Sequence, residues 1–520
     1  MKAGKALRAI AGAALCGIGL LLGLALPYQS HSFRIDAGGC RLVTDIVEPT
    51  TQPVGDKPQG YVVLFHGLSA NKRIMSYLTA AFAAEGLRVF APDFPGHGRS
   101  DSPFSYDRSE QCAENLVREL TARGLLDPEK TILAGHSLGG AVALRVASTV
   151  PVAGVIALSP APMRPLRGVA PEMMPFHGFD KLPPHSLVMS ASGDPSQIRD
   201  GARELIPTPG DGTSQYMIIP HSSHTSVLFD PIAASNSQNW AARVLHLTSQ
   251  PRPPSRKGLL GFAAGFIGIL LLAGPFLRET LQKKNQEMPL AETAVAAGKG
   301  RAFLEYGLVG LGTVGVLSYI NPLRALRLFE GDYLASFLLI LGVVVLALHW
   351  NSLRKVLGPR TSSGQPARAL TFTLLAAAFT AFLLLFLITA WIDLTFSEAW
   401  LTVPRWARFA PLLIALLPYH AAEELLLGPA TQDGRNKGWR RLITALALRA
   451  VAWVALVVGV FVLHSGEVLL VLLAPSFLIF CILQIWGMKV VREVTASPAA
   501  AALFGAILLA GFCLVVFPTT

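Results

Sequence analysis

Hydrophobic and polar residues follow three different patterns along the chain. Residues 1–27 are a basic start followed by one long apolar run. Residues 28–250 have mixed polarity, with short apolar runs between helix-like stretches. From residue 258 to 520, long apolar runs alternate with short polar segments, after a proline-rich, basic linker at 251–257. The patterns predict an N-terminal membrane helix, a globular domain and a polytopic membrane domain.

The N-terminal segment is predicted to be an uncleaved signal anchor. Lys2, Lys5 and Arg8 precede an apolar run that is long for the core of a signal peptide. No small-residue cleavage site precedes Pro27. A cleaved signal peptide is the alternative.

The pattern of residues 28–250 predicts an α/β domain. Short apolar runs predict strands at 61–67, 87–94, 131–137, 154–160, 186–194 and 215–223. Helix-like segments lie between most of them, for example at 75–85, 110–123 and 141–149. Strands that alternate with helices imply a mostly parallel sheet covered on both faces.

The C-terminal half is predicted to contain about eight transmembrane helices. Most of its apolar runs have the ~20 residues that a helix needs to cross a bilayer core. The whole chain is 52% hydrophobic and 15% charged, far less charged than a typical soluble protein. The runs lie at 258–276, 303–320, 333–350, 369–392, 409–427, 442–464, 466–487 and 497–517.

Basic residues set the expected orientation and the expected partners. The net charge of +11 comes largely from lysines and arginines in short segments between apolar runs, which favours a membrane rather than nucleic acid as the partner. If the N-terminus is cytoplasmic, eighteen basic residues fall in cytoplasmic segments and four in the short opposite loops. This bias predicts an integral inner-membrane protein whose residues 28–257 lie outside the cytoplasm, in the periplasm or outside the cell.

One short motif carries the strongest chemical signal. Gly135-His136-Ser137-Leu138-Gly139 lies between a predicted strand and a helix-like run. A serine between glycines at such a turn is typical of a nucleophile elbow, which lifts the hydroxyl above the sheet edge. Ser137 is therefore the candidate nucleophile, and Gly135, His136 and Gly139 support its turn.

The same order of strands supplies an oxyanion site and two partners for the serine. His66 and Gly67 end the first predicted strand, so the backbone N–H of Leu68 can face a developing oxyanion together with that of Leu138. Asp194 follows a late strand and His224 follows the last one.

The histidine has one competitor in the sequence. His221 lies three residues before His224, but the helix-like stretch after His224 fits the expected ending better.

Residues 60–245 resemble the α/β-hydrolase superfamily, in particular its serine aminopeptidase S33 and monoacylglycerol-lipase-like branch. The resemblance rests on these motifs together with "DFPGHGRS" (93–100) and Gly193-Asp194. It implies that Ser137 attacks an acyl carbonyl, His224 moves the proton and Asp194 orients the imidazole. His66, His97 and Asp93 are expected to hold backbone geometry. We expect no metal or cofactor.

The segment between the fourth and fifth predicted strands is short, so a large helical lid is not expected. Its apolar side chains suit an acyl-chain pocket, although an ordinary packed loop explains them equally well. The candidate pocket residues are Met163, Met173, Met174 and Phe176.

Several questions stay open at this stage. Cys40 and Cys112 can pair if the domain lies in an oxidising compartment, but the sequence does not give their separation. His420, Glu423 and Glu424 share a predicted span and resemble the intramembrane CAAX-protease-like pattern, but the arginine expected after the glutamates is missing. The alternative is that the glutamates lie at the cytoplasmic end of the span or pair with Arg449.

The sequence favours a membrane-anchored serine hydrolase that cleaves an acyl ester, with a lipid-like substrate. An S33-type peptidase is the second hypothesis. The third is a transporter or scaffold whose hydrolase-like domain only binds or regulates.

Overall fold

The computed structural model describes residues 2–23, 28–49, 58–162, 182–206, 213–248, 251–281, 299–357, 367–428, 435–463 and 468–520. These residues form two compact units. The sheet unit consists of Ile18–Ala264, Trp391–Trp400 and Pro518–Thr520. The helical unit consists of Met1–Gly17, Gly265–Ala390 and Leu401–Phe517. Two short segments of the C-terminal half thus belong to the sheet unit, which the sequence pattern did not indicate.

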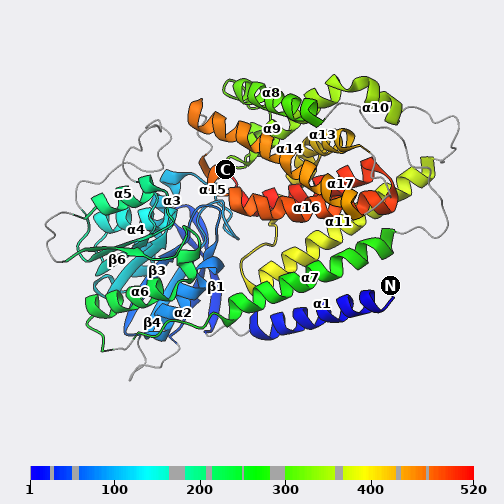
Figure 1. The fold of residues 1–520 in the computed structure, drawn as a ribbon. Helices are drawn as coiled ribbons and strands as arrows, with labels where there is room; N and C mark the ends of the chain where they lie inside the picture. Colours follow the sequence, from blue (N-terminus) through cyan, green and yellow to red (C-terminus); the bar gives the residue numbers. More distant parts are fainter. Residues whose placement is uncertain are drawn as a thin grey trace. The chain divides into compact units, whose positions relative to one another are not determined.

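The sheet unit is built on one mixed sheet (Figure 1). Among the described residues its strands are β1 (Ser30–Ala37), β2 (Cys40–Val47), β3 (Gly60–Phe65), β4 (Leu87–Pro92), β5 (Thr131–His136), β6 (Gly154–Leu158), β7 (Ser186–Ala191) and β8 (Gln215–Ile219).

The strand order is β1-β2-β4-β3-β5-β6-β7-β8. Strands β3 to β8 are parallel, whereas β1 pairs antiparallel with β2, and β2 with β4. The predicted, mostly parallel sheet is confirmed. The β1–β2 hairpin was not predicted, although Gly38 and Gly39 mark its turn, both with positive φ.

Helices cover both faces of this sheet (Figure 1). Helices α2 and α6 contact each other on one face, and α3 and α4 contact each other on the other. Every residue of β5 is buried, as expected for a central parallel strand. The helices are α2 (Ser76–Ala84), α3 (Tyr106–Ala122), α4 (Leu138–Thr149), α5 (Ser196–Glu204) and α6 (Pro231–Val244).

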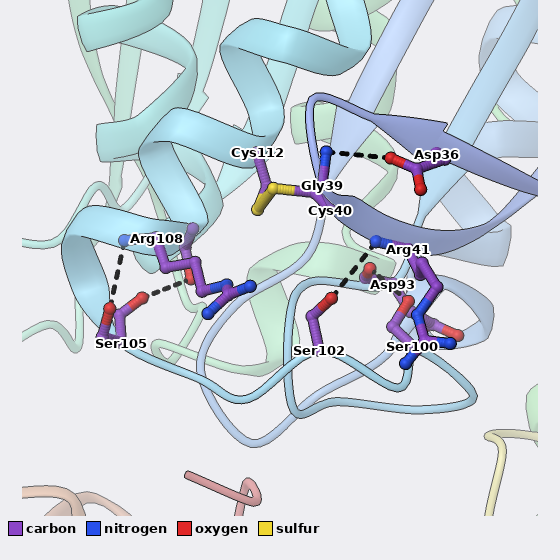
Figure 2. Close-up of a disulfide and its surroundings, with 11 residues drawn as sticks. Asp36, Gly39, Cys40, Arg41, Asp93, Ser100, Ser102, Ser105, Arg108 and Cys112 are labelled. Atoms are coloured by element: carbon purple, nitrogen blue, oxygen red, sulfur yellow. Dashed lines mark hydrogen bonds between the residues drawn. A yellow bond between two sulfur atoms is a disulfide. The ribbon is translucent and has the colours of Figure 1, made fainter.

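A disulfide joins Cys40 at the start of β2 to Cys112 in the middle of α3 (Figure 2). Both cysteines are buried. The bond ties the antiparallel hairpin to the helix layer, 72 residues further along the chain. The pairing that the sequence left open is therefore present.

The helical unit contains the long apolar helices, some of which extend into the sheet unit. The helices outside residues 28–256 are α1 (Lys2–Gly23), α7 (Lys257–Leu281), α8 (Lys299–Leu317), α9 (Gly331–Leu348), α10 (Trp350–Leu357), α11 (Ala367–Thr395), α12 (Val403–Trp406), α13 (Phe409–Leu427), α14 (Arg435–Val462), α15 (Val468–Leu472), α16 (Ala474–Thr495) and α17 (Pro498–Val516).

Within the described residues, eight helical segments are long and apolar enough to cross a membrane. One is N-terminal and seven follow residue 256. Helix α8, which covers the predicted run at 303–320, is not among them. These helices suggest a multi-pass membrane region by length and composition.

Charged side chains inside the helical unit have partners. Arg449 contacts both carboxylate oxygens of Glu423 at 2.8 Å, and Glu424 contacts Arg441 at 2.7 Å. The alternative in which Glu423 pairs with Arg449 is therefore the one observed. No group of three metal-binding side chains occurs in the part of the chain that the structure describes.

Candidate active site

Ser137 lies at a sharp turn between β5 and α4. Its φ of 52° and ψ of −116° place a non-glycine residue in a strained conformation. The turn is held by its backbone, because the Ser137 N–H donates to Leu158 O at 2.9 Å and the Ala161 N–H donates to Ser137 O at 2.8 Å. This is the geometry of a nucleophile elbow.

The elbow requires glycine on both sides. A Cβ added at Gly135 would lie 2.2 Å from Gly139 O, and one added at Gly139 would lie 2.3 Å from Phe65 O. Both distances are far inside van der Waals contact with backbone, which cannot move aside easily. The two glycines of the motif are therefore explained by the close approach of the turn to β3 and α4.

The structure brings Ser137, His224 and Asp194 together. His224 Nε2 lies 3.0 Å from Ser137 Oγ, and His224 Nδ1 lies 2.7 Å from Asp194 Oδ1. The His224 side chain is 20% exposed and that of Asp194 is fully buried. His221, the competing histidine, is exposed and lies in the turn after β8. The serine and the imidazole are thus accessible, while the carboxylate is shielded from water.

Asp194 is surrounded by donors. Ser159 Oγ donates to its Oδ2 at 2.6 Å, and the Ala191 N–H donates to the same oxygen at 2.8 Å. Burial alone would raise the pKa of Asp194, but hydrogen bonds from His224 and Ser159 lower the pKa below its ordinary value. The carboxylate is therefore held ionised beside the imidazole. Ser159, which directly follows β6, had no predicted role.

His136, inside the motif, supports the histidine loop. Its Nε2 lies 2.7 Å from His224 O. Burial and the nearby His224 ring lower the pKa of His136 to about 3, so the ring is neutral and can donate this hydrogen bond. His136 thus fixes the backbone of the residue that contacts Ser137.

The loop after β3 lies directly against the nucleophile. A Cβ added at Gly67 would be 3.3 Å from Ser137 Cβ. Leu68 is the next residue after Gly67. Leu138 is the first residue of α4, so its backbone N–H has no acceptor within that helix. The two expected oxyanion donors therefore belong to backbone segments that flank Ser137.

Three buried side chains hold this loop. His66 Nε2 accepts from the Phe94 N–H at 2.9 Å, and burial lowers the pKa of His66 to about 4. His97 Nε2 accepts from the Ser69 N–H at 3.2 Å, and Asp93 Oδ1 accepts from the Lys72 N–H at 2.9 Å. Each of the three side chains thus accepts a hydrogen bond from a backbone N–H of this loop or of the 93–99 turn.

The candidate pocket residues Met163, Met173, Met174 and Phe176 lie outside the described residues.

Comparison with known proteins identifies the family of the domain that carries these residues. Residues 62–304 match the alpha/beta hydrolase family. They contain an alpha/beta hydrolase domain, and a largely helical region follows them. The fold class predicted from the sequence is confirmed.

The relatives are distant. A monoacylglycerol lipase from Mycolicibacterium smegmatis is 32% identical over 125 residues, which cover 24% of this chain and 42% of that protein. Esterase YjfP from Escherichia coli is 31% identical over 123 residues, which cover 21% of this chain and 49% of that protein. The chain thus spans less than half the length of either relative.

A solved structure of a soluble monoglyceride lipase variant from Saccharomyces cerevisiae aligns with a TM-score of 0.32 and 15% identity. The alignment covers 42% of this chain and 96% of that chain.

Proposed function

We propose that the protein is a membrane-anchored serine hydrolase that cleaves an acyl ester, with a lipid-like substrate. The observation that carries this proposal is the hydrogen-bonded line from Ser137 through His224 to Asp194 on a strained elbow. The alpha/beta hydrolase domain and its lipase and esterase relatives support the ester class. The resemblance of residues 60–245 to the monoacylglycerol-lipase-like branch of the superfamily favours a substrate with a lipid-like acyl group.

The reaction would proceed by two acyl transfers. Ser137 Oγ attacks the ester carbonyl while His224 Nε2 takes its proton. The tetrahedral intermediate collapses, and the alcohol leaves with that proton. Water then attacks the acyl-enzyme with His224 as general base, which releases the acid and regenerates Ser137. Asp194 keeps Nδ1 protonated and stabilises the imidazolium that forms in each half-reaction.

The backbone N–H groups of Leu68 and Leu138 would stabilise the negative oxygen of both tetrahedral intermediates. Their effect depends on position, because donors must lie near the place that the oxyanion occupies rather than near the ground-state carbonyl oxygen. The contact of Gly67 with Ser137 supports this assignment, since it brings the Leu68 segment beside the nucleophile.

The apolar helices would hold the domain at a bilayer, where lipid-like esters are concentrated. We propose that residues 28–250 form the hydrolase domain and that residues 258–520 form the polytopic membrane domain. The positive-inside bias supports a location of the hydrolase domain outside the cytoplasm. The Cys40–Cys112 disulfide supports the same location, because disulfides persist in oxidising compartments.

The proposal is tested by turnover of p-nitrophenyl acyl esters of increasing chain length by the full chain in detergent micelles. Aminoacyl p-nitroanilides form the second arm. We expect ester hydrolysis that Ser137→Ala abolishes and that Ser148→Ala leaves unchanged, because Ser148 is an exposed serine on the same helix. Faster cleavage of the anilides would favour a peptidase. Equal activity of wild type and Ser137→Ala would contradict the proposal.

A further inference from the structure

The segment Trp391–Trp400 belongs to the sheet unit although it begins inside the apolar helix α11, which ends at Thr395. Asn71 and Arg73 both bond its backbone, Asn71 at Glu398 and Arg73 at Asp393. Asn71 Nδ2 donates to Ser397 Oγ at 2.9 Å and to Glu398 O at 3.0 Å, and the Glu398 N–H donates back to Asn71 Oδ1 at 3.2 Å. These contacts join residues 326 and 327 positions apart.

A buried charge cluster lies beside this contact. Lys72 Nζ lies 2.7 Å from Asp93 Oδ2 and also contacts Glu398 Oε1. The side chains of Lys72 and Asp93 are fully buried, and that of Glu398 is 5% exposed. Arg99 Nε approaches the same Glu398 oxygen at 3.4 Å. A buried ammonium is tolerated only with good partners, so the position of Lys72 is set by Asp93 and Glu398 together.

This cluster is continuous with the loop that carries Leu68. Leu68 follows Gly67, at which an added Cβ would meet Ser137, and precedes Asn71 and Lys72, which contact Glu398. On the other side the loop is held by His97 and Asp93. Residues 67–72 are thus held between the 93–99 turn on one side and Ser397 and Glu398 on the other.

A second segment from the C-terminal half is hydrogen-bonded to the 93–99 turn and to Phe104. The Phe104 N–H donates to Thr519 O at 2.8 Å, and the Thr519 N–H donates to Gly96 O at 3.1 Å. The turn that holds the oxyanion loop is therefore itself paired with residues 518–520 of the sheet unit.

We propose that Glu398 is a positioning residue for the oxyanion loop, so that the hydrolase site is completed by a segment from the membrane half of the chain. Glu398 acts through Lys72 and Asn71 and does not touch substrate. Two short segments of the C-terminal half, Trp391–Trp400 and Pro518–Thr520, are then structural parts of the catalytic unit. This inference rests on the proposed serine hydrolase function.

The chemistry of Glu398 predicts how its variants differ. Burial and the carboxylate of Asp93 raise the pKa of Glu398 to about 8 against the opposing effect of Lys72. A neutral amide of the same shape therefore resembles the protonated acid, whereas alanine removes every contact of the side chain. We expect Glu398→Gln to retain more activity than Glu398→Ala.

The experiment measures kcat and KM for a short p-nitrophenyl ester with the full chain in detergent micelles, per folded monodisperse molecule. For Glu398→Ala we expect kcat to fall about 10- to 100-fold with KM nearly unchanged, because a displaced oxyanion donor acts in the transition state. Glu119→Ala is the matched control, since Glu119 forms an exposed ion pair with Arg123 on α3. Its kcat should equal that of the wild type.

A second variant tests the same contact from the other side. Asn71→Ala removes the bonds to the Ser397 hydroxyl and the Glu398 backbone. It should also lower kcat more than KM, which keeps the inference testable if Glu398→Ala does not fold. Wild-type kcat in either folded variant would overturn the inference while the proposed function stands. Absence of ester turnover by the wild type would instead overturn the proposed function.

Discussion

The Cys40–Cys112 disulfide gives a stability prediction whose size follows from the structure. The bond closes a loop with a sequence separation of 72. In the chain-entropy model, a loop of this length stabilises the folded state by about 4 kcal/mol, because the cross-link removes conformations of the unfolded chain. Both sulfur atoms belong to buried residues, so alanine is the appropriate replacement, since serine would bury two hydroxyl groups.

The perturbation is the double variant Cys40→Ala/Cys112→Ala, compared with the wild type with and without reductant. For a domain of this size, about 4 kcal/mol corresponds to a fall in Tm of roughly 8–16 °C. The assay is thermal unfolding of the full chain in detergent micelles, followed by near-UV circular dichroism.

The reductant supplies the control. It should lower the Tm of the wild type and leave the double variant unchanged, because the remaining cysteines are not in disulfides in the described structure. If thiol titration shows both cysteines reduced while the wild-type Tm does not move, the reasoning is refuted.

Two further predictions concern the site. Asp194→Asn should lower kcat by roughly 10³–10⁴-fold with the fold retained, because the amide favours the wrong imidazole tautomer; ester kinetics with circular dichroism check this, and near-normal kcat would contradict the role of Asp194. His66 and His136 stay neutral in the fold, since burial lowers their pKa values to about 4 and about 3. Their contribution to the free energy of unfolding is fully present above pH 6.5. As the pH falls from 6.5 toward these values, each histidine lowers the free energy of unfolding by up to about 1.4 kcal/mol per pH unit. Denaturant unfolding between pH 7 and pH 4 measures the slope, and replacement of either histidine by glutamine should reduce it; a flat profile would contradict the assignment.

Local patterns predicted the parts of the fold that depend on local physics. The central strands and the elbow were visible because buried parallel strands read as apolar runs and because a tight strand-to-helix turn demands glycine. The predicted strands at 131–137 and 186–194 were too long, since the residues after His136 and Ala191 already belong to the site. The proximity of Ser137, Asp194 and His224 could be expected because each lies a few residues after the end of a strand, at the same edge of the sheet.

Long-range contacts could not be predicted in the same way. In the sequence, Lys72 looks like an ordinary surface lysine and Glu398 like an ordinary glutamate in a loop. Only the fold brings these two residues together, although they are 326 positions apart in the chain. Ser159 likewise acquires its partner Asp194 from the neighbouring strand β7. The β1–β2 hairpin does carry a local signal, alternating side chains around two glycines, but its first strand, SHSFRIDA, contains no apolar run.

The central claim is that Ser137 is an activated nucleophile. Labelling of the full chain with a fluorophosphonate probe, followed by mass spectrometry of the modified peptide, tests it most directly. We expect one adduct on Ser137 in the wild type and in Ser148→Ala, and no adduct in folded Ser137→Ala. An unlabelled wild type, or equal labelling of Ser137→Ala, would contradict it.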